Sequence, residues 1–275
     1  MELHQGELPV EVPLLDPKTR QTAMTTVTQG GRRDLKSTTA TSGGLGFSLT
    51  TQNQLETTLY YWRVKVQDTI GPLSLLSALQ YEDYLPGIVI REPSLLDGVP
   101  GPIRSIDIGW HNLGEVNAAG VDLKVRKRTR AWGGHLISEV GATWNSDYKY
   151  RELPAEISLP LDRVGTASER GSILRHRATV QFAWENDTWR LATTITEHPS
   201  YRDADALNRF SFSVRSQTLV DLRISRYWGA SSLTVGATNL FDSEPGYANV
   251  SAWGYDVSQG DLRGRFLYGE VRIGF

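Results

Sequence analysis

The chain has 275 residues, a formal net charge of −2 at pH 7 and no cysteine. The balanced charge argues against nucleic acid as a partner, and without cysteine the chain forms neither a disulfide nor a thiolate metal site. No apolar run reaches the roughly 18 to 20 residues of a membrane-spanning helix, and the first residues lack the basic and apolar regions of a signal peptide.

Segments that alternate apolar and polar residues predict β-strands along most of the chain. In chain order they lie near 38–50, 54–68, 115–129, 134–148, 173–185, 188–200, 210–227, 231–241 and 264–275. Short turns at 51–54, 130–134, 185–189 and 227–231 alternate with long loops at 69–114, 149–172, 201–209 and 242–263. Within the first long loop, 72–80 could form a helix, and 88–93 could pair with 103–110 as a hairpin.

Charged and apolar residues take opposite faces of these predicted strands. Val220 and Leu222 alternate with charged residues in 210–227, and the last strand follows the same rule. The charges predicted on the polar face of these strands are Asp221, Arg223, Glu270 and Arg272. In the second strand we expect Tyr60 and Trp62 on the apolar face, opposite Arg63.

Two environments produce such alternation. A soluble antiparallel sheet buries its apolar face and exposes its charged face to water. An outer-membrane barrel turns its apolar face to lipid and its charged face to a hydrated lumen. Strands of about ten residues and the sorting of short turns and long loops favour the barrel. A soluble β-sandwich or small barrel with carbohydrate-binding loops stays open as the alternative.

Several motifs resemble those of TonB-dependent outer-membrane receptors. The stretch VGATNLFDSEPGY at 235–247 resembles the family's NLFD turn, and GYDVSQGDLRGRFLYGEVRIGF at 254–275 resembles its closing segment. The stretches 30–70 and 111–125 are similar to two further family segments, in the family's order. The residues that carry the motifs are Asn239, Leu240, Phe241, Asp242, Gly264, Arg265, Tyr268 and Phe275.

The resemblance implies an all-β, transmembrane antiparallel segment of about nine strands from a larger barrel of roughly 22 strands. We expect 37–275 to be the C-terminal barrel segment and 1–36 to be a loop that leads into its first strand. The family's plug domain and TonB-contacting segment are expected to be missing from this chain. An aromatic residue at the end of the last strand, Phe275, is implied to be the signal that the barrel-assembly machinery reads.

The same resemblance implies a function in the outer membrane of a Gram-negative bacterium. The complete protein would take up a scarce nutrient of the siderophore, cobalamin or oligosaccharide class. Its partners would be outer-membrane lipid, a plug domain, the TonB energy-coupling complex, the barrel-assembly machinery and a small-molecule ligand bound partly by the long loops. The charged face would line the lumen and face the plug.

No catalytic, cofactor or metal site is predicted. The five histidines have no ligand spacing, and the acidic stretch 81–84 is expected to be a solvated part of the longest loop. Ser105, Asp107 and His111 form the only local cluster with residues of a catalytic type. Three polar residues in a loop hairpin do not make a proton relay, so we predict that the protein is not an enzyme.

Overall fold

The computed structural model describes residues 9–30, 35–94, 98–151, 153, 161–167, 171–204, 211–250, 253–260 and 262–274. It divides into two compact units. Unit 1 comprises Met1–Thr41, Lys65–Val116 and Tyr150–Leu161, and unit 2 comprises Ser42–Val64, Asn117–Lys149 and Asp162–Phe275. Among the described residues, no helix has both the length and the hydropathy needed to cross a bilayer.

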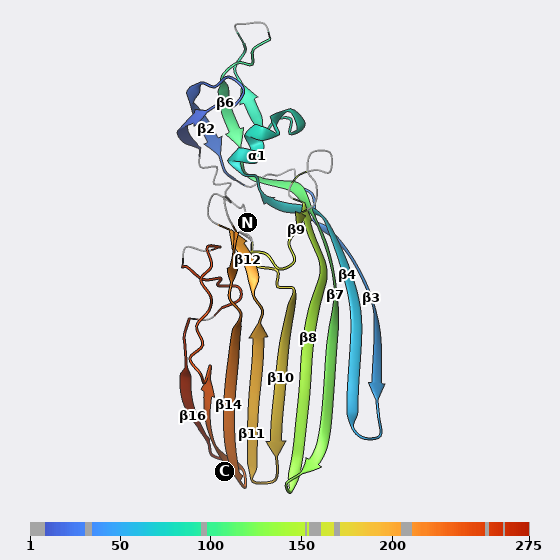
Figure 1. Cartoon of the computed structure of the whole chain (residues 1–275). Coiled ribbons are helices and arrows are strands. Elements are labelled where there is room, and N and C mark those ends of the chain that lie inside the picture. Colours follow the sequence, from blue (N-terminus) through green and yellow to red (C-terminus); the bar gives the residue numbers. More distant parts are fainter. Residues whose placement is uncertain are drawn as a thin grey trace. The chain divides into compact units, whose positions relative to one another are not determined.

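A long sheet holds most of the strands, in the order β16-β15-β14-β11-β10-β8-β7-β4-β3 (Figure 1). Its strands are β3 (Thr39–Thr50), β4 (Leu55–Pro72), β7 (Trp110–Ala131), β8 (Gly134–Arg151), β10 (His176–Glu185), β11 (Trp189–His198), β14 (Gln217–Trp228), β15 (Ser231–Thr238) and β16 (Phe266–Arg272). A short β9 (Leu161–Asp162) pairs with β8. These nine main strands confirm the predicted all-β fold and the predicted chain order.

The short turns are confirmed as well, and they lie together at one end of unit 2 (Figure 1). Trp132, Gly133 and Gly229 make two of them with φ values of 49°, 71° and 60°, in the left-handed region that a tight hairpin requires. The pairs β8–β10, β10–β11, β11–β14, β14–β15 and β15–β16 are all antiparallel. We call this end of the sheet the short-turn end.

Unit 1 contains a smaller sheet with the order β1-β2-β6-β5. Its strands are β1 (Val10–Leu15), β2 (Thr22–Thr28), β5 (Val89–Arg91) and β6 (Ile103–Asp107), and β2 runs parallel to β6. The antiparallel pair β5–β6 confirms the predicted hairpin, and α1 (Leu75–Gln80), followed by the 3-10 turn η1 (Glu82–Tyr84), confirms the predicted helix. Ser74 caps α1 by accepting a hydrogen bond from the Ser77 backbone N–H at 3.0 Å.

The prediction that 1–36 is a loop is wrong for β1 and β2, because these two stretches are paired strands. Val27 of β2 faces Ile106 of β6, and both are buried. The core of unit 1 consists of Leu73, Ala78, Leu79, Leu85, Ile88, Ile103, Ile106 and Leu153. β2 is therefore stabilised by residues about 80 positions away along the chain.

The predicted strand 210–227 is split in two. β13 (Ser211–Val214) pairs with β12 (Tyr201–Ala204) in a separate hairpin, and β14 begins only at Gln217. This hairpin packs on a small core in unit 2 made of Leu174, Tyr201, Val214 and Ala248. The long loop after β15 is thereby held against the hairpin, because Ala248 belongs to that loop.

Candidate functional site

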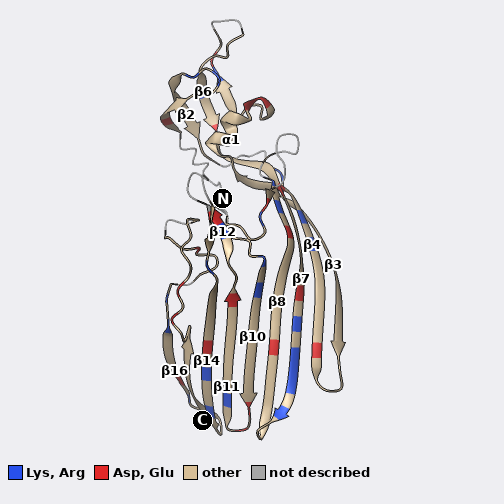
Figure 2. Cartoon of the chain, viewed as in Figure 1, with Lys and Arg blue, Asp and Glu red and all other residues tan. Residues whose placement is uncertain are grey.

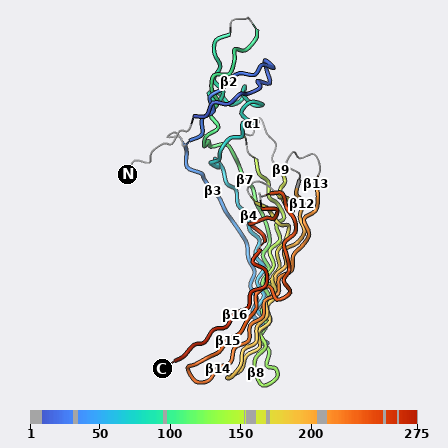
Figure 3. Tube along the Cα trace, turned by 90° about the vertical axis from the view of Figure 1, so that its left-hand side faces the viewer, coloured from blue at the N-terminus to red at the C-terminus, as the bar shows by residue number. Residues whose placement is uncertain are grey.

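One face of the long sheet is apolar and uncovered. The register aligns one residue from each of five neighbouring strands on this face: Phe182, Thr193, Leu222, Ala237 and Leu267. Phe182 is 43% exposed and Leu267 is 68% exposed. Seen from the side, β8, β14, β15 and β16 form a single layer (Figure 3). The two hydrophobic cores of the described residues contain no residue from these strands, so none of the described residues forms a protein layer against the apolar face.

The apolar stretch on this face has the same length on three neighbouring strands. Its boundaries are aromatic or polar residues: Trp184 and His176 on β10, Trp189 and Glu197 on β11, and Arg226 and Thr218 on β14. Eight positions separate the two members of each pair. At about 3.3 Å per residue and a tilt of about 40°, the stretch is roughly 20 Å high, close to the ~25 Å apolar band of outer-membrane barrels.

The opposite face carries the charges. Arg223 Nη2 lies 3.7 Å from Glu270 Oε2, and Arg272 Nη2 lies 3.3 Å from Glu270 Oε1. Asp221 Oδ1 accepts a hydrogen bond from the Asn239 backbone N–H at 2.9 Å. The four residues predicted for the polar face therefore lie on one face of β14 and β16, but that this face lines a lumen stays a prediction.

Figure 2 shows a basic run along the lower part of β7. Its Lys124, Arg126 and Arg128 belong to this charged face. Lys124 Nζ lies 3.1 Å from Glu139, and Arg126 lies 3.9 Å from the same carboxylate. Arg128 lies 3.7 Å from Glu185. Basic and acidic side chains thus alternate across the strands, which limits the repulsion between like charges on neighbouring strands.

The expected faces of β4 are wrong. Trp62 contacts Gly120 of β7, and Tyr60 lies over Gly44 and Gly46 of β3. Because Gly120 is two positions from Asp122, both rings lie on the charged face. The glycines leave room for the rings, and a side chain at these positions would collide with them. The space above the glycines therefore decides which face these aromatics take.

The NLFD motif joins three strands. Asn239 has a left-handed φ of 48°, and its side chain both accepts from the Ser243 N–H at 2.8 Å and donates to the Ser243 carbonyl at 2.9 Å. Asp242 Oδ1 then accepts from the Arg265 backbone N–H at 2.8 Å. Together with the bond to Asp221, these contacts fix the end of β15 between β14 and the approach to β16.

The other motif residues extend this arrangement. Leu240 donates its backbone N–H to the Val220 carbonyl at 2.7 Å, while the Phe241 side chain is 73% exposed. Gly264, with a φ of 67°, lies against Asp242 Oδ1, where a Cβ would crowd the carboxylate at 2.8 Å. On β16, Tyr268 covers Gly236 of β15. Phe275 lies outside the described residues.

A cavity of about 760 Å³ adjoins the motif in unit 2. Its lining residues come from β13, from the link between β13 and β14, and from the loop between β15 and β16: Phe212, Ser213, Arg215, Asp242, Ser243, Glu244, Pro245, Tyr247, Trp253, Gly254, Tyr255, Leu262 and Gly264. Trp253 is 76% exposed, and the rings of Tyr247 and Phe212 are 5.8 Å apart. Aromatic faces combined with Arg215 suit an organic ligand with flat rings and a polar or anionic edge. The loop 242–263 was expected to contact ligand, but of these lining residues only Asp242 and Gly264 were singled out from the sequence, and those as motif residues.

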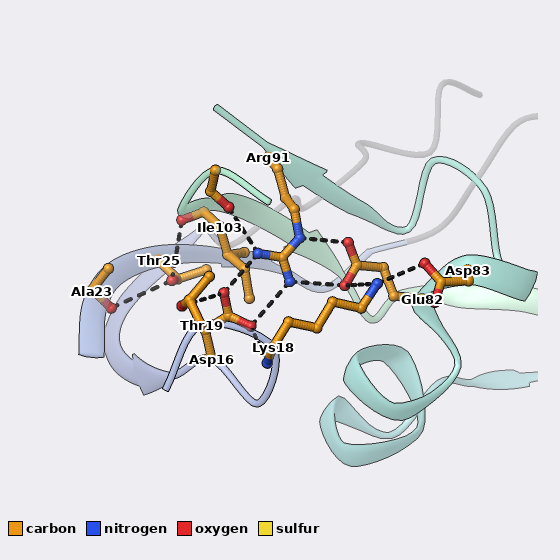
Figure 4. A network of polar contacts seen from close by, with 10 residues as sticks. Asp16, Lys18, Thr19, Ala23, Thr25, Glu82, Asp83, Arg91 and Ile103 are labelled. Atoms are coloured by element: carbon orange, nitrogen blue, oxygen red, sulfur yellow. Dashed lines mark hydrogen bonds and ion pairs between the residues drawn. The ribbon is translucent and has the colours of Figure 1, made fainter. Parts of the chain in front are cut away.

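A charged cluster organises unit 1 (Figure 4). Arg91 donates two hydrogen bonds to Asp16, at 2.6 and 3.0 Å, and two to Glu82, at 2.6 and 2.8 Å. Lys18 lies 3.2 Å from Glu82 and 2.6 Å from Asp83. The Arg91 hydrogen bonds hold the pKa values of Asp16 and Glu82 below their usual range. The expectation that 81–84 is a solvated loop is therefore wrong for Glu82, whose side chain is 12% exposed and joins two loops, whereas the Asp83 side chain is 76% exposed.

The described residues contain no group of three or more histidine, aspartate and glutamate side chains placed to hold a metal ion. His111 Nε2 lies 3.7 Å from Asp107 Oδ1. Asp107 uses the same oxygen to accept from the Gly109 N–H at 2.9 Å, and no described hydrogen bond joins Ser105 to either residue.

The sequence matches no protein-family model and has no significant match among curated proteins. Solved structures are similar in fold. A variant of the ferric enterobactin receptor PfeA from Pseudomonas aeruginosa has a TM-score of 0.61 and 18% identity over 91% of this chain and 33% of that one. The siderophore receptor PirA from Acinetobacter baumannii has a TM-score of 0.61 and 15% identity over 91% and 33%. The iron transporter FrpB from Neisseria meningitidis has a TM-score of 0.58 and 10% identity over 89% and 32%.

The chain therefore spans about a third of the length of these receptors. They are transport receptors rather than enzymes. The described chain has the fold of a segment of their β-barrel, which confirms the resemblance to TonB-dependent outer-membrane receptors at the level of the fold.

Proposed function

We propose that the chain is the C-terminal part of the barrel of a TonB-dependent transporter in the outer membrane of a Gram-negative bacterium. The uncovered apolar face carries this proposal, because a face of this extent needs an apolar surrounding. Val235 is 50% exposed and Val271 is 65% exposed on it. The soluble sandwich would need a second layer here, and the described strands have none.

The cargo is a scarce small molecule of the siderophore, cobalamin or oligosaccharide class. The similarity to receptors named for ferric enterobactin and siderophores favours the first of these classes. We place part of the outer ligand site in the cavity near the NLFD motif, where Arg215, Tyr247 and Trp253 offer a cation and two aromatic faces. The other long loops would complete the site.

The charged face would line the lumen and contact a plug domain, and the TonB complex would supply energy through that plug. The barrel-assembly machinery would read Phe275. We expect Arg223→Glu in the full-length protein to reduce uptake or to change the force needed to extract the plug, because it repels Glu270, which now lies 3.7 Å away. Unchanged uptake together with unchanged extraction force would remove this role for the charged face.

Uptake in a deletion strain tests the transport function. The strain is supplied with labelled ferric siderophores, cobalamin and oligosaccharides, one at a time. Loss of uptake of one cargo, restored by the intact gene, is the expected result. Trp253→Ala should weaken restoration, whereas Trp132→Ala should not, because Trp132 is an equally exposed tryptophan (80% against 76%) in a turn at the short-turn end. Full uptake of every cargo in the deletion strain would contradict the proposal.

A further inference from the structure

The short-turn end of the sheet is rich in tryptophan. Half of the chain's eight tryptophans lie there: Trp132, Trp184, Trp189 and Trp228. Strand alternation places the last three on the apolar face, at the limit of the apolar stretch. Trp228 is 51% exposed and Trp189 is 37% exposed. Indole rings prefer the boundary between hydrocarbon and water, so these residues mark the height of a membrane interface.

The charges on the apolar face at this end are basic. Arg226 follows Ile224 on the apolar face of β14, and Lys127 follows Val125 on the same face of β7. The acidic strand residues at this end, Glu185 among them, lie on the charged face. A positive charge turned toward lipid is costly at the centre of a bilayer and nearly free of cost at the interface.

Arg226 lies over the Trp189 ring, without an acidic partner among the described residues. Its guanidinium carbon lies 5.2 Å from the centre of the Trp189 ring, directly across the β11–β14 pair. It forms no ion pair with any carboxylate of the described residues. The cation–π contact holds the guanidinium over the indole, and a guanidinium so placed still offers N–H groups at its edge. A planar group of this kind matches the paired oxygens of a phosphate.

We propose that Arg226, which lies over Trp189 and shares a face of β14 with Trp228, binds the headgroup phosphate of an anionic phospholipid such as phosphatidylglycerol. The inference rests on the proposed function, because it requires the apolar face to meet lipid. Ile224 and Leu233, next to Arg226 on the same face, would contact the acyl chains of that lipid. Lys127 provides a second, weaker contact with the same leaflet. An anionic headgroup is favoured over a zwitterionic one because Arg226 and Lys127, at the short-turn end of the apolar face, are both positive.

Fluorescence quenching in micelles tests the site. The full 275-residue chain is solubilised in a neutral detergent, and the micelles are doped with brominated phosphatidylglycerol or brominated phosphatidylcholine. Bromine quenches tryptophans that touch the lipid, so the titration gives an affinity for each. We expect a preference of about fivefold for phosphatidylglycerol from one cationic side chain. Arg226→Gln should remove most of that preference, leaving only the weaker part from Lys127, and it keeps all eight tryptophans in place.

Arg190→Gln is the matched control. Arg190 lies at the same height on β11, next to Trp189, but on the charged face, 3.9 Å from Glu185. It should keep the fivefold preference. Equal affinities of the unchanged chain for the two lipids would overturn the headgroup site but not the proposed function. The same holds if Arg226→Gln and Arg190→Gln lose the phosphatidylglycerol preference equally. A chain that is monomeric in plain buffer and is quenched by neither lipid would overturn the proposed function, and the headgroup site with it.

Discussion

Replacing Arg91 with methionine is predicted to destabilise the small sheet of unit 1. The Arg91 and Asp16 side chains are only 12% and 5% exposed, and Arg91 makes four hydrogen bonds to Asp16 and Glu82. Methionine keeps the apolar stem but leaves both carboxylates without this partner. Removing one member of a buried ion pair costs about 3–5 kcal/mol. Glu82 keeps Lys18 at 3.2 Å, so we expect the lower limit, about 3 kcal/mol.

Hydrogen exchange of the chain in detergent measures this change locally. A loss of about 3 kcal/mol lowers amide protection by roughly a hundredfold, and we expect it in β1, β2, β5 and β6 but not in β10, β11 or β14. The control is Arg104→Met, which removes an exposed pair, 3.6 Å from Glu92, with the Arg104 side chain 68% exposed. That variant should change protection little. Equal protection in the two variants would refute the role assigned to Arg91.

The same cluster predicts a dependence on pH. The folded state lowers the pKa values of Asp16 and Glu82 below their ordinary values of 3.8 and 4.5, chiefly through hydrogen bonds from Arg91. The unfolded state therefore binds more protons in acid, so the stabilisation is complete above these ordinary values and is lost as the pH falls below them. Protection of the small sheet, corrected for intrinsic exchange, should fall in acid in the unchanged chain and much less in Arg91→Met.

Two further substitutions test the motif and the glycine contacts. Asp242→Ala should free the Arg265 amide and raise protease cleavage in 242–263, with a loss of about 1–2 kcal/mol, because it removes an acceptor and places alanine at a φ of 55°. Cleavage as slow as in the unchanged chain would argue that the Asp242–Arg265 hydrogen bond does not hold this loop in place. Gly236→Ala should destabilise the β15–β16 pair by about 1–3 kcal/mol through collision with Tyr268, as judged by hydrogen exchange, whereas Gly141→Ala, which meets no atom within 4 Å, should not. Equal effects would contradict the contact.

Much of the long sheet follows from local sequence alone. Alternation with a period of two identifies strands wherever one face is apolar, and the hairpin turns carry residues suited to a left-handed backbone, such as Gly133 and Gly229. The NLFD turn was recognised as a motif, and its hydrogen bonds follow from the short polar side chains of Asn239 and Asp242. These features depend on neighbours in the sequence or on one adjacent strand.

The missed features depend on contacts between distant residues. Tyr60 and Trp62 look apolar, but their face is set by glycines on β3 and β7, which only the pairing of the strands brings beneath them. β2 contains four threonines among seven residues and is stabilised by β6, about 80 positions later. The Arg91 cluster also depends on distant residues, because Arg91 and Asp16 are 75 positions apart in the sequence. A single sequence carries no signal of such pairings.

The orientation of the two sheet faces is the central claim, and the absence of cysteine makes it directly measurable. Leu222→Cys and Arg223→Cys carry one spin label each at adjacent positions of β14. In detergent or lipid, the label at 222 should be accessible to oxygen, which partitions into hydrocarbon, and shielded from a water-soluble nickel chelate. The label at 223 should show the reverse. Both labels in contact with water, or the label at 222 inaccessible to both reagents in a dry protein core, would contradict the account.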